Sequence, residues 1–196
     1  MKRNILTAVL MTIVTTILLG LVYPLVVTGV AQVLFHDKAN GQLIVQDGKT
    51  VGSRVLAQPF TGAGYFHPRA SAAGTNGYDA TNSGGTNYGP TNQKLIDRVK
   101  QDVAAAQQEN PGHAVPVDYV TTSASGLDPD ITPANAEFQG PRVARERGIS
   151  LEQAMALVKA HTKGRQLGVL GEARVNVLEL NLDLDRQVPL AKRAAR

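Results

Sequence analysis

The sequence predicts an α+β protein in which one N-terminal transmembrane helix is followed by a single mixed extracytoplasmic domain. Two observations support this fold class. An uncharged apolar run lies near the N-terminus, and short strand patterns alternate with amphipathic helix patterns in the remainder, without an internal repeat. The chain has 196 residues, so about 160 remain after the apolar run, which is enough for one domain with a hydrophobic core.

The apolar run carries no formal charge between Arg3 and Asp37. It is longer than the roughly 20 residues that an α-helix needs to cross the hydrocarbon core. Backbone groups in lipid must be hydrogen-bonded within the segment, which favours a helix. We therefore expect a transmembrane anchor at 5–35, with its core at about 7–29. A cleaved signal peptide is the alternative, but its apolar core would span only about 7–15 residues.

Basic residues at the N-terminus predict the orientation of the anchor. Lys2 and Arg3 precede it, and no basic residue follows until Lys38. Because Lys and Arg favour the cytoplasmic side of a membrane, residues 1–4 are expected in the cytoplasm and residues 36–190 in the periplasm. The predicted location is therefore the bacterial inner membrane, crossed once.

Composition excludes several classes of function. The formal net charge of +4 is shared between the N-terminus and a basic tail at 191–196, so the folded part is near neutral and nucleic acid is not expected as a partner. The chain has no cysteine, which excludes disulfides and thiolate chemistry.

Small or weakly polar residues recur at four-residue spacing along the anchor. Such residues let helices approach closely in a membrane, so Thr12, Thr16, Gly20 and Pro24 are a candidate partner interface; residues merely tolerated in a single-pass helix are the alternative. Because proline removes a helical hydrogen bond, a kink is also expected at Tyr23-Pro24. The full row is Ala8, Thr12, Thr16, Gly20, Pro24 and Thr28.

Periodicity and turn residues predict the strands of the outer domain. Alternating or β-branched runs joined by turn residues indicate strands. Asp47-Gly48 is a favoured hairpin turn between the first two. For the last strand, a short helix is the alternative. The strands are expected at 42–46, 50–56, 115–121 and 178–185.

Capping residues predict the helices. Asn92, Thr132 before Pro133, and Ser150 with Gln153 are each suited to the start of a helix. Gly140-Pro141 is expected to break or kink the second helix. The Gly-, Asn- and Ser-rich stretch 61–92 is too long for a simple connection, and its aromatic residues indicate an ordered surface loop.

No self-sufficient catalytic or metal site is expected. Gly48-Lys49-Thr50 fails as a phosphate-binding loop because Leu43 stands where that motif requires glycine. The four histidines are scattered without metal-ligand spacing, and no nucleophile–base pair is visible. Asp128 and Asp130 remain open to two interpretations, a pair for acid–base chemistry or a turn leading into a helix.

Two features indicate binding. Ser83-Gly84-Gly85 and the residues after it offer backbone and side-chain donors that suit an anion, although flexible turn chemistry is an alternative. Arg142 and Arg145 fall three apart on a helix with Gln139 nearby, which suits an anion or an acidic partner. A solvated helix face is the alternative there.

Long motifs in order along the chain resemble the KdpC family, the small subunit of the bacterial high-affinity Kdp potassium-transporting ATPase. The resemblance covers nearly the whole chain, with single departures such as Gly140 in place of a branched apolar residue. The motifs are Val22-Tyr-Pro-Leu, Phe60-Thr-Gly-Ala-Gly-Tyr-Phe-His, Ser83-Gly-Gly-Thr-Asn, Ser123-Ala-Ser-Gly-Leu-Asp-Pro-Asp-Ile-Thr-Pro-Ala, Arg142-Val-Ala-Arg and Val175-Asn-Val-Leu-Glu-Leu-Asn-Leu-Asp-Leu-Asp.

The resemblance implies a non-catalytic subunit with three partners: the potassium-selecting KdpA, the ATP-hydrolysing KdpB and the small KdpF. It implies a catalytic chaperone that raises the ATP affinity of KdpB in a transient ternary complex and binds no cofactor tightly. Gln139 matches the proposed nucleotide contact of the family. Ser83, Gly84 and Gly85 are weaker candidates.

The predicted orientation conflicts with direct contact to ATP. It places Gln139 outside, across a hydrocarbon core about 30 Å thick, whereas ATP is cytoplasmic. An effect on ATP affinity would then be reciprocal coupling through the membrane subunits. The alternative function is a periplasmic cap that stabilises the outer mouth of KdpA without touching nucleotide. An unrelated anchored binding module, which would purify without a large membrane partner, is a further alternative.

Overall fold

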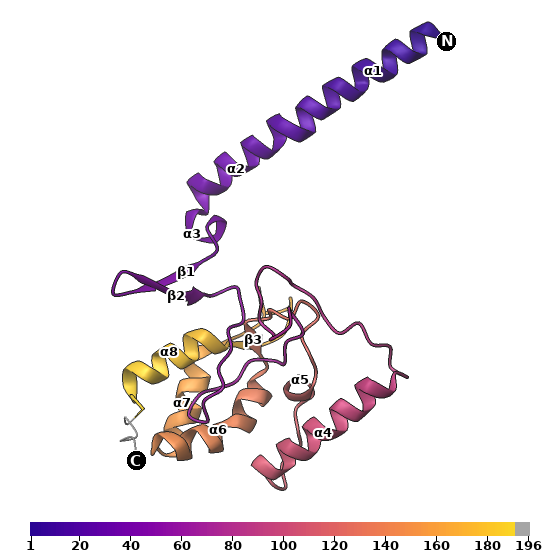
Figure 1. Cartoon of the computed structure of the whole chain (residues 1–196). Coiled ribbons are helices and arrows are strands. Elements are labelled where there is room, and N and C mark those ends of the chain that lie inside the picture. The colour runs from indigo at the N-terminus through magenta and orange to yellow at the C-terminus, as the bar shows by residue number, and fades with distance from the viewer. Residues whose placement is uncertain (191–196) are drawn as a thin grey trace. The chain divides into compact units, whose positions relative to one another are not determined.

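The computed structural model describes residues 1–190 and separates into two compact units, one at 1–43 and one from Ile44 onward (Figure 1). The predicted basic tail at 191–196 lies outside the described residues. One apolar helical unit followed by a mixed helix and small-sheet domain confirms the α+β class.

The N-terminal unit contains a continuous helix, Lys2–Leu34, that is long and apolar enough to cross a membrane. None of its side chains is buried within the chain. A π turn over Leu18–Val22 lies directly before Tyr23-Pro24, and Pro24 has no N–H to donate to the carbonyl of Gly20. The kink expected at this point stays a prediction. The segments are α1 (Lys2–Ile17), η1 (Leu18–Val22), α2 (Tyr23–Leu34) and the short α3 (His36–Ala39).

Over the described residues 43–190, two small antiparallel sheets accompany five helices. The strands β1 and β2 form the hairpin predicted at Asp47-Gly48, and β5 lies between β3 and β4 with Val175 opposite both Ile131 and Thr162. The elements are β1 (Leu43–Gln46), β2 (Lys49–Ser53), α4 (Gln93–Glu109), α5 (Val117–Val120), β3 (Asp130–Ile131), α6 (Pro133–Arg147), α7 (Leu151–His161), β4 (Thr162–Lys163), β5 (Arg174–Asn176) and α8 (Val177–Gln187).

The hydrophobic core lies where α6, α7 and α8 meet the three-stranded sheet. Figure 1 shows α6, α7 and α8 grouped together, with α4 and α5 to one side of them. Burial of these apolar side chains stabilises the domain by removing their surface from water. The core residues are Phe66, Ile131, Ala136, Val143, Leu157, Val158, Val175, Val177, Leu180 and Leu184.

The three predicted helix starts are confirmed. Asn92 accepts a hydrogen bond from the N–H of Lys94, and Thr132 accepts one from the N–H of Asn135. Ser150 forms the full capping box with its partner glutamine. Each cap satisfies amide groups that the first helical turn leaves without partners.

Two predicted strands are wrong. The segment 115–121 contains the helical turn α5, which begins after Pro116 and is closed by a hydrogen bond from the Thr121 hydroxyl to the Val117 carbonyl. The segment 178–185 lies in helix α8, as the alternative interpretation held. Its buried residues include Leu180 and Leu184, which lie one helical turn apart, while Leu182 is only partly buried. The helical period, and not the two-residue alternation, therefore determines which face enters the core.

At Gly140-Pro141 a break or a kink was expected, and a kink there stays a prediction; the break is wrong, because α6 continues through this point. The reason is tertiary packing. A Cβ atom on Gly140 would lie 2.2 Å from the terminal methyl group of Met155 in α7. The Met155 methyl group therefore fills the space beside Gly140, and the packing of α6 against α7 supports a helix that proline alone would weaken.

Candidate functional site

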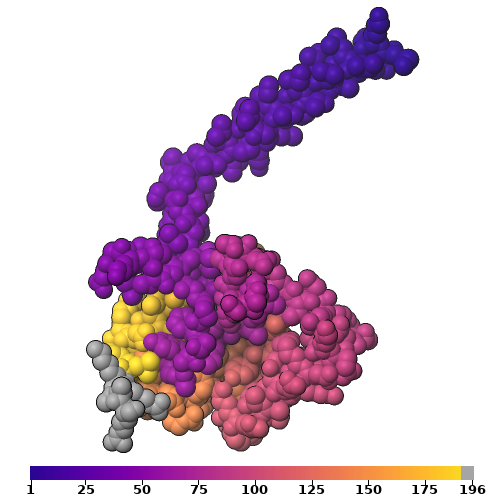
Figure 2. Space-filling model, viewed as in Figure 1, coloured from indigo at the N-terminus to yellow at the C-terminus, as the bar shows by residue number. Residues whose placement is uncertain are grey.

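The long loop predicted at 61–92 contains no helix or strand, and its first part is inserted into the domain. Phe66 is fully buried in the core. Figure 2 shows the purple atoms of this part of the chain directly beside the yellow atoms of α8. Buried backbone groups need hydrogen-bond partners, and here side chains of α6 and α8 supply them.

Gln139 is the centre of this arrangement, and its side chain is completely buried. Its amide oxygen accepts from the backbone N–H of His67 at 2.7 Å, and its amide nitrogen donates to the backbone carbonyl of His67 at 3.0 Å. The same nitrogen donates to the Asn135 side chain at 2.8 Å. Gln139 thus holds one loop residue by both backbone groups, as a neighbouring β-strand would.

Arg142 extends the network one turn further along α6. Its guanidinium donates to the Gln139 amide oxygen and to the backbone carbonyls of Ala63 and Tyr65. Its Nε donates to the Glu109 carboxylate at 2.7 Å, an ion pair that joins α6 to α4. Only 8% of the arginine side chain is exposed, so this cation is directed into the protein.

Two more side chains, one from α6 and one from α8, bind the backbone of this loop. Asn181 binds both backbone groups of Phe66, accepting at 2.9 Å and donating at 2.8 Å. Arg147 donates to the Gly64 carbonyl at 2.7 Å and pairs with Asp185 at 2.8 Å. Four side chains from two helices therefore bind the backbone of the continuous segment 63–67.

The charges in this network are balanced. Burial, and then the Arg142 charge, lower the pKa of His67, so this ring is neutral at pH 7. Burial and a hydrogen bond from its hydroxyl to Glu109 raise the pKa of Tyr119 to about 12. The Arg142 cation is therefore compensated by the Glu109 carboxylate, with neutral groups around both.

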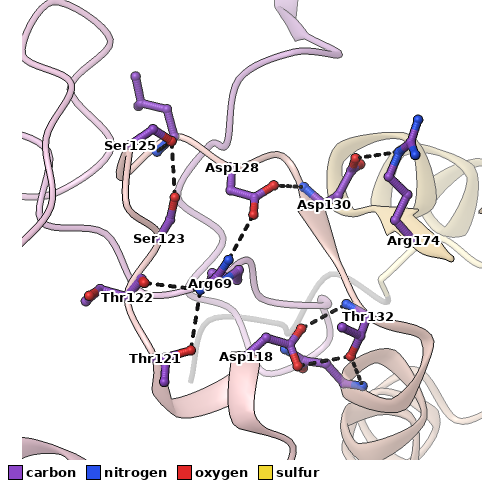
Figure 3. A network of polar contacts seen from close by, with 12 residues as sticks. Arg69, Asp118, Thr121, Thr122, Ser123, Ser125, Asp128, Asp130, Thr132 and Arg174 are labelled. Atoms are coloured by element: carbon purple, nitrogen blue, oxygen red, sulfur yellow. Dashed lines mark hydrogen bonds and ion pairs between the residues drawn. The ribbon is translucent and has the colours of Figure 1, made fainter. Parts of the chain in front are cut away.

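Figure 3 shows a second network, which joins the loop to the segment before α6. Arg69 pairs with Asp128 at 3.1 Å and donates to the Thr122 carbonyl at 3.1 Å. Asp128 also accepts from the N–H of Asp130, whose carboxylate pairs with Arg174 at 3.0 Å. Both carboxylates are thus occupied by turn contacts and arginines, which supports the turn interpretation over acid–base chemistry.

The Ser83-Gly84-Gly85 segment packs against the turn at 123–126. The Ser83 hydroxyl and the Gly84 N–H both donate to the Ser125 carbonyl at 2.9 Å. A Cβ atom on Gly85 would lie 2.7 Å from the Ala124 carbonyl oxygen. Gly85 therefore allows close contact between two backbone segments, and the donors of Ser83 and Gly84 are directed at protein.

The structure separates Arg145 from its predicted companion. Its side chain is 64% exposed and lies 3.7 Å from Glu146, whereas Arg142 is buried. The two cations do not form one surface, and a partner contact at Arg145 stays a prediction. The anchor residues Thr12, Thr16 and Gly20 lie along one exposed helix with Pro24, and their contacts with a partner also stay a prediction.

Sequence reasoning did not single out Asn181, Arg147 or Glu109. A usable signal existed for Asn181, which lies at helical spacing from Val177 and Leu184 inside an apolar face. A polar residue on such a face is buried only with a hydrogen-bond partner. Glu109 gave no comparable signal, because its partner Arg142 is distant in sequence.

The sequence model of a family described as "KdpC: K+-transporting ATPase, c chain" matches residues 5–186. The chain belongs to the KdpC family. A potassium-transporting ATPase KdpC subunit of Koribacter versatilis is 69% identical over 190 residues, which are 97% of this chain and 98% of that protein. The corresponding subunit of Rhodospirillum rubrum is 54% identical over 193 residues, covering 97% of this chain and 100% of that protein.

A KdpC subunit of Mycobacterium tuberculosis is 53% identical over 189 residues, covering 95% of this chain and 100% of that protein. The resemblance inferred from the motifs is thus confirmed. The part matched by the KdpC family includes the anchor and every residue of the two polar networks. The family is that of the c chain of the K+-transporting ATPase.

Proposed function

We propose that this chain is the membrane-anchored, non-catalytic KdpC subunit of a bacterial potassium-transporting ATPase, and that it acts through assembly with the other subunits and not by holding nucleotide. One observation supports the proposal that the chain does not hold nucleotide. The Gln139 side chain is fully buried, and both ends of its amide are bound to protein.

A nucleotide contact at Gln139 does not fit this geometry. Freeing the amide would leave the N–H and carbonyl of His67 without partners inside the protein, at about 1–3 kcal/mol for each group. The Arg142 guanidinium would also lose its bond to the amide oxygen. The alternative donors at Ser83 and Gly84 are likewise bound to Ser125. No step through ATP is therefore assigned to these residues.

The chaperone role implied by the resemblance is proposed here in an indirect form. If the outer domain is periplasmic, as Lys2 and Arg3 indicate, a change in the ATP affinity of KdpB passes through subunit contacts. Such coupling is reciprocal, so ATP binding would alter the affinity of the complex for this chain by the same factor.

The proposed partners are KdpA, KdpB and KdpF, together with membrane lipid around the anchor. The helix Lys2–Leu34 supports membrane insertion by its length and composition. The row that includes Thr12, Thr16 and Gly20 suits close packing against a transmembrane helix of a partner. The outer domain is proposed to cap the outer mouth of KdpA and to stabilise its loops.

The test is photoaffinity labelling of the purified complex with an azido-ATP, read for each subunit separately. The expected result is label in the ATP-hydrolysing subunit and none in this chain above the level with excess unlabelled ATP. Specific label in this chain that disappears in Gln139→Leu, while the variant still co-purifies with the complex, would overturn the proposal. Arg145→Leu, on the exposed side of the same helix, is the matched control.

A further inference from the structure

The segment 164–173, between β4 and β5, forms a small hairpin that we call the prong. Gln166 and Leu170 exchange two backbone hydrogen bonds, at 2.8 and 2.9 Å. Leu167 and Gly168 form its tip, and both have positive φ angles, 53° and 78°. Leu167, Gly168 and Val169 therefore form a three-residue loop between the paired residues, and its first two residues are left-handed.

The prong carries its apolar side chains on the outside. Leu167 is 91% exposed, Val169 73% and Leu170 56%. Among the described residues from Ile44 onward, Leu167 is the most exposed large apolar side chain. Single exposed apolar residues are ordinary on protein surfaces, but three on one turn form a cluster of the kind that marks interaction sites.

The backbone at the tip gives an independent reason to infer a bound partner. The left-handed conformation of Leu167 is unfavourable for a residue with a large side chain, and Asn, Asp or Gly is the usual residue in that conformation. Strained residues of this kind gather at functional sites.

The charges at the base of the prong favour protein over lipid as the occupant. Arg165 binds both oxygens of Glu172, at 2.7 and 2.8 Å. Lys163 pairs with Glu179 and Arg174 with Asp130, so every cation from 163 to 174 already has a carboxylate partner. A segment that inserts into a lipid interface typically presents unpaired basic and aromatic residues. The prong has no aromatic residue.

The prong lies close to the point where the chain arrives from β1 and β2. Glu179 pairs with Lys163 at the base of the prong and also with Arg54, the residue directly after β2, at 2.9 Å. Asn176 donates to the Arg54 carbonyl at 2.9 Å. The base of the prong is therefore linked through Glu179 to the residue that follows β2.

We propose that the prong inserts Leu167, Val169 and Leu170 into an apolar socket with an uncharged polar rim on another membrane-embedded subunit of the potassium-transporting ATPase. This inference rests on the proposed assembly function. It identifies the surface that makes the contact and the chemistry of the surface that receives it.

The first experiment compares Leu167→Asn with Val117→Asn, an equivalent change at a side chain that is 76% exposed on α5. Each full-length variant is co-expressed with the other subunits, one of which is tagged, and its recovery on that tag is measured. Loss of a buried leucine should reduce recovery of Leu167→Asn by about tenfold or more. Val117→Asn should be recovered like the wild type.

The thermal midpoint of each purified full-length chain separates docking from folding. Asn tolerates the left-handed conformation, so Leu167→Asn should unfold at the same temperature as the wild type or higher. Reduced recovery together with unchanged or raised stability would support the proposal. Recovery equal to that of Val117→Asn would overturn it.

A photoreactive benzoylphenylalanine at position 167 identifies the occupant. An adduct with a membrane subunit of the complex supports the proposal, and an adduct with lipid alone overturns it. Expression of the other subunits without this chain tests the assembly function separately. If they assemble and transport potassium with unchanged affinity, the proposed function fails; if they need the chain but not the prong, only the inference about the prong fails.

Discussion

Replacement of Gln139 by Leu should destabilise the outer domain strongly, because a similar volume is kept while every hydrogen bond of the amide is lost. The N–H and carbonyl of His67 would remain buried without the partners they have now. Arg142 and Asn135 would each lose one bond. A buried polar group left unpaired costs about 1–3 kcal/mol, so we expect a loss of about 3–6 kcal/mol, out of the roughly 5–15 kcal/mol typical of a domain.

Denaturant unfolding of the full-length chain in detergent measures this loss. The chain has no tryptophan and five tyrosines, so near-ultraviolet circular dichroism reports tertiary structure through tyrosine. Tyr65 and Tyr119 both lie in the network. The matched control is Arg145→Leu on the same helix, whose exposed side chain should change stability by no more than about 0.5 kcal/mol.

A free energy of unfolding for Gln139→Leu within about 0.5 kcal/mol of the wild type would refute the reasoning, since surface substitutions produce changes of that size. Stability that is unchanged together with a weaker apparent ATP affinity of the complex would point instead to the nucleotide contact implied by family resemblance. Both measurements on the same preparation therefore distinguish a structural Gln139 from a ligand-binding one.

Three further results are expected. Asn181→Leu should free the backbone of Phe66 and speed limited proteolysis within 60–67, whereas cleavage elsewhere stays unchanged. Burial and the Arg142 charge lower the pKa of His67 from 6.5. Below that pH the unfolded chain therefore binds more protons than the folded chain, so stability should fall as the pH drops from 6.5. His67→Gln should flatten that dependence. Asn92→Ala should lower the unfolding free energy by about 1 kcal/mol, through loss of the cap on α4.

Features decided by neighbouring residues could be predicted from the sequence. The caps at Asn92, Thr132 and Ser150 depend on hydrogen bonds that span two or three residues, and the anchor depends on composition alone. The hairpin turn at Asp47-Gly48 is equally local. In each case the residues that favour the structure and the residues that form it are the same.

Features decided by contacts between distant parts of the chain could not be predicted from the sequence. The alternating leucines of 178–185 fit a strand, but the same residues also place Leu180 and Leu184 one helical turn apart, and only the core shows which period is used. The helix break expected at Pro141 is absent because Gly140 packs on Met155 of α7. The sequence contains no local trace of that contact, so tertiary packing overrides the local preference.

The candidate site illustrates the same limit for polar residues. Helical spacing placed Gln139 and Arg142 on neighbouring turns, which is correct, but periodicity does not tell whether polar side chains meet water or a buried backbone. The neighbouring apolar residues do not answer this question, because Val143 and Ala136 are buried on the same helix as these polar residues. The deciding partner is a loop about 70 residues earlier in the chain, whose hydrogen bonds span 72 positions.

The polar network also explains how an irregular segment occupies the centre of the domain. Residues 63–67 pair with no strand, so their backbone groups would be costly to bury without substitutes. The amides of Gln139 and Asn181 reproduce the donor–acceptor pair of a strand, and Arg142 and Arg147 bind the intervening carbonyls. Side chains so engaged fix one loop conformation and leave few groups for a ligand. The proposed contacts with other subunits would then come from surfaces outside this network, and the exposed apolar prong is one such surface.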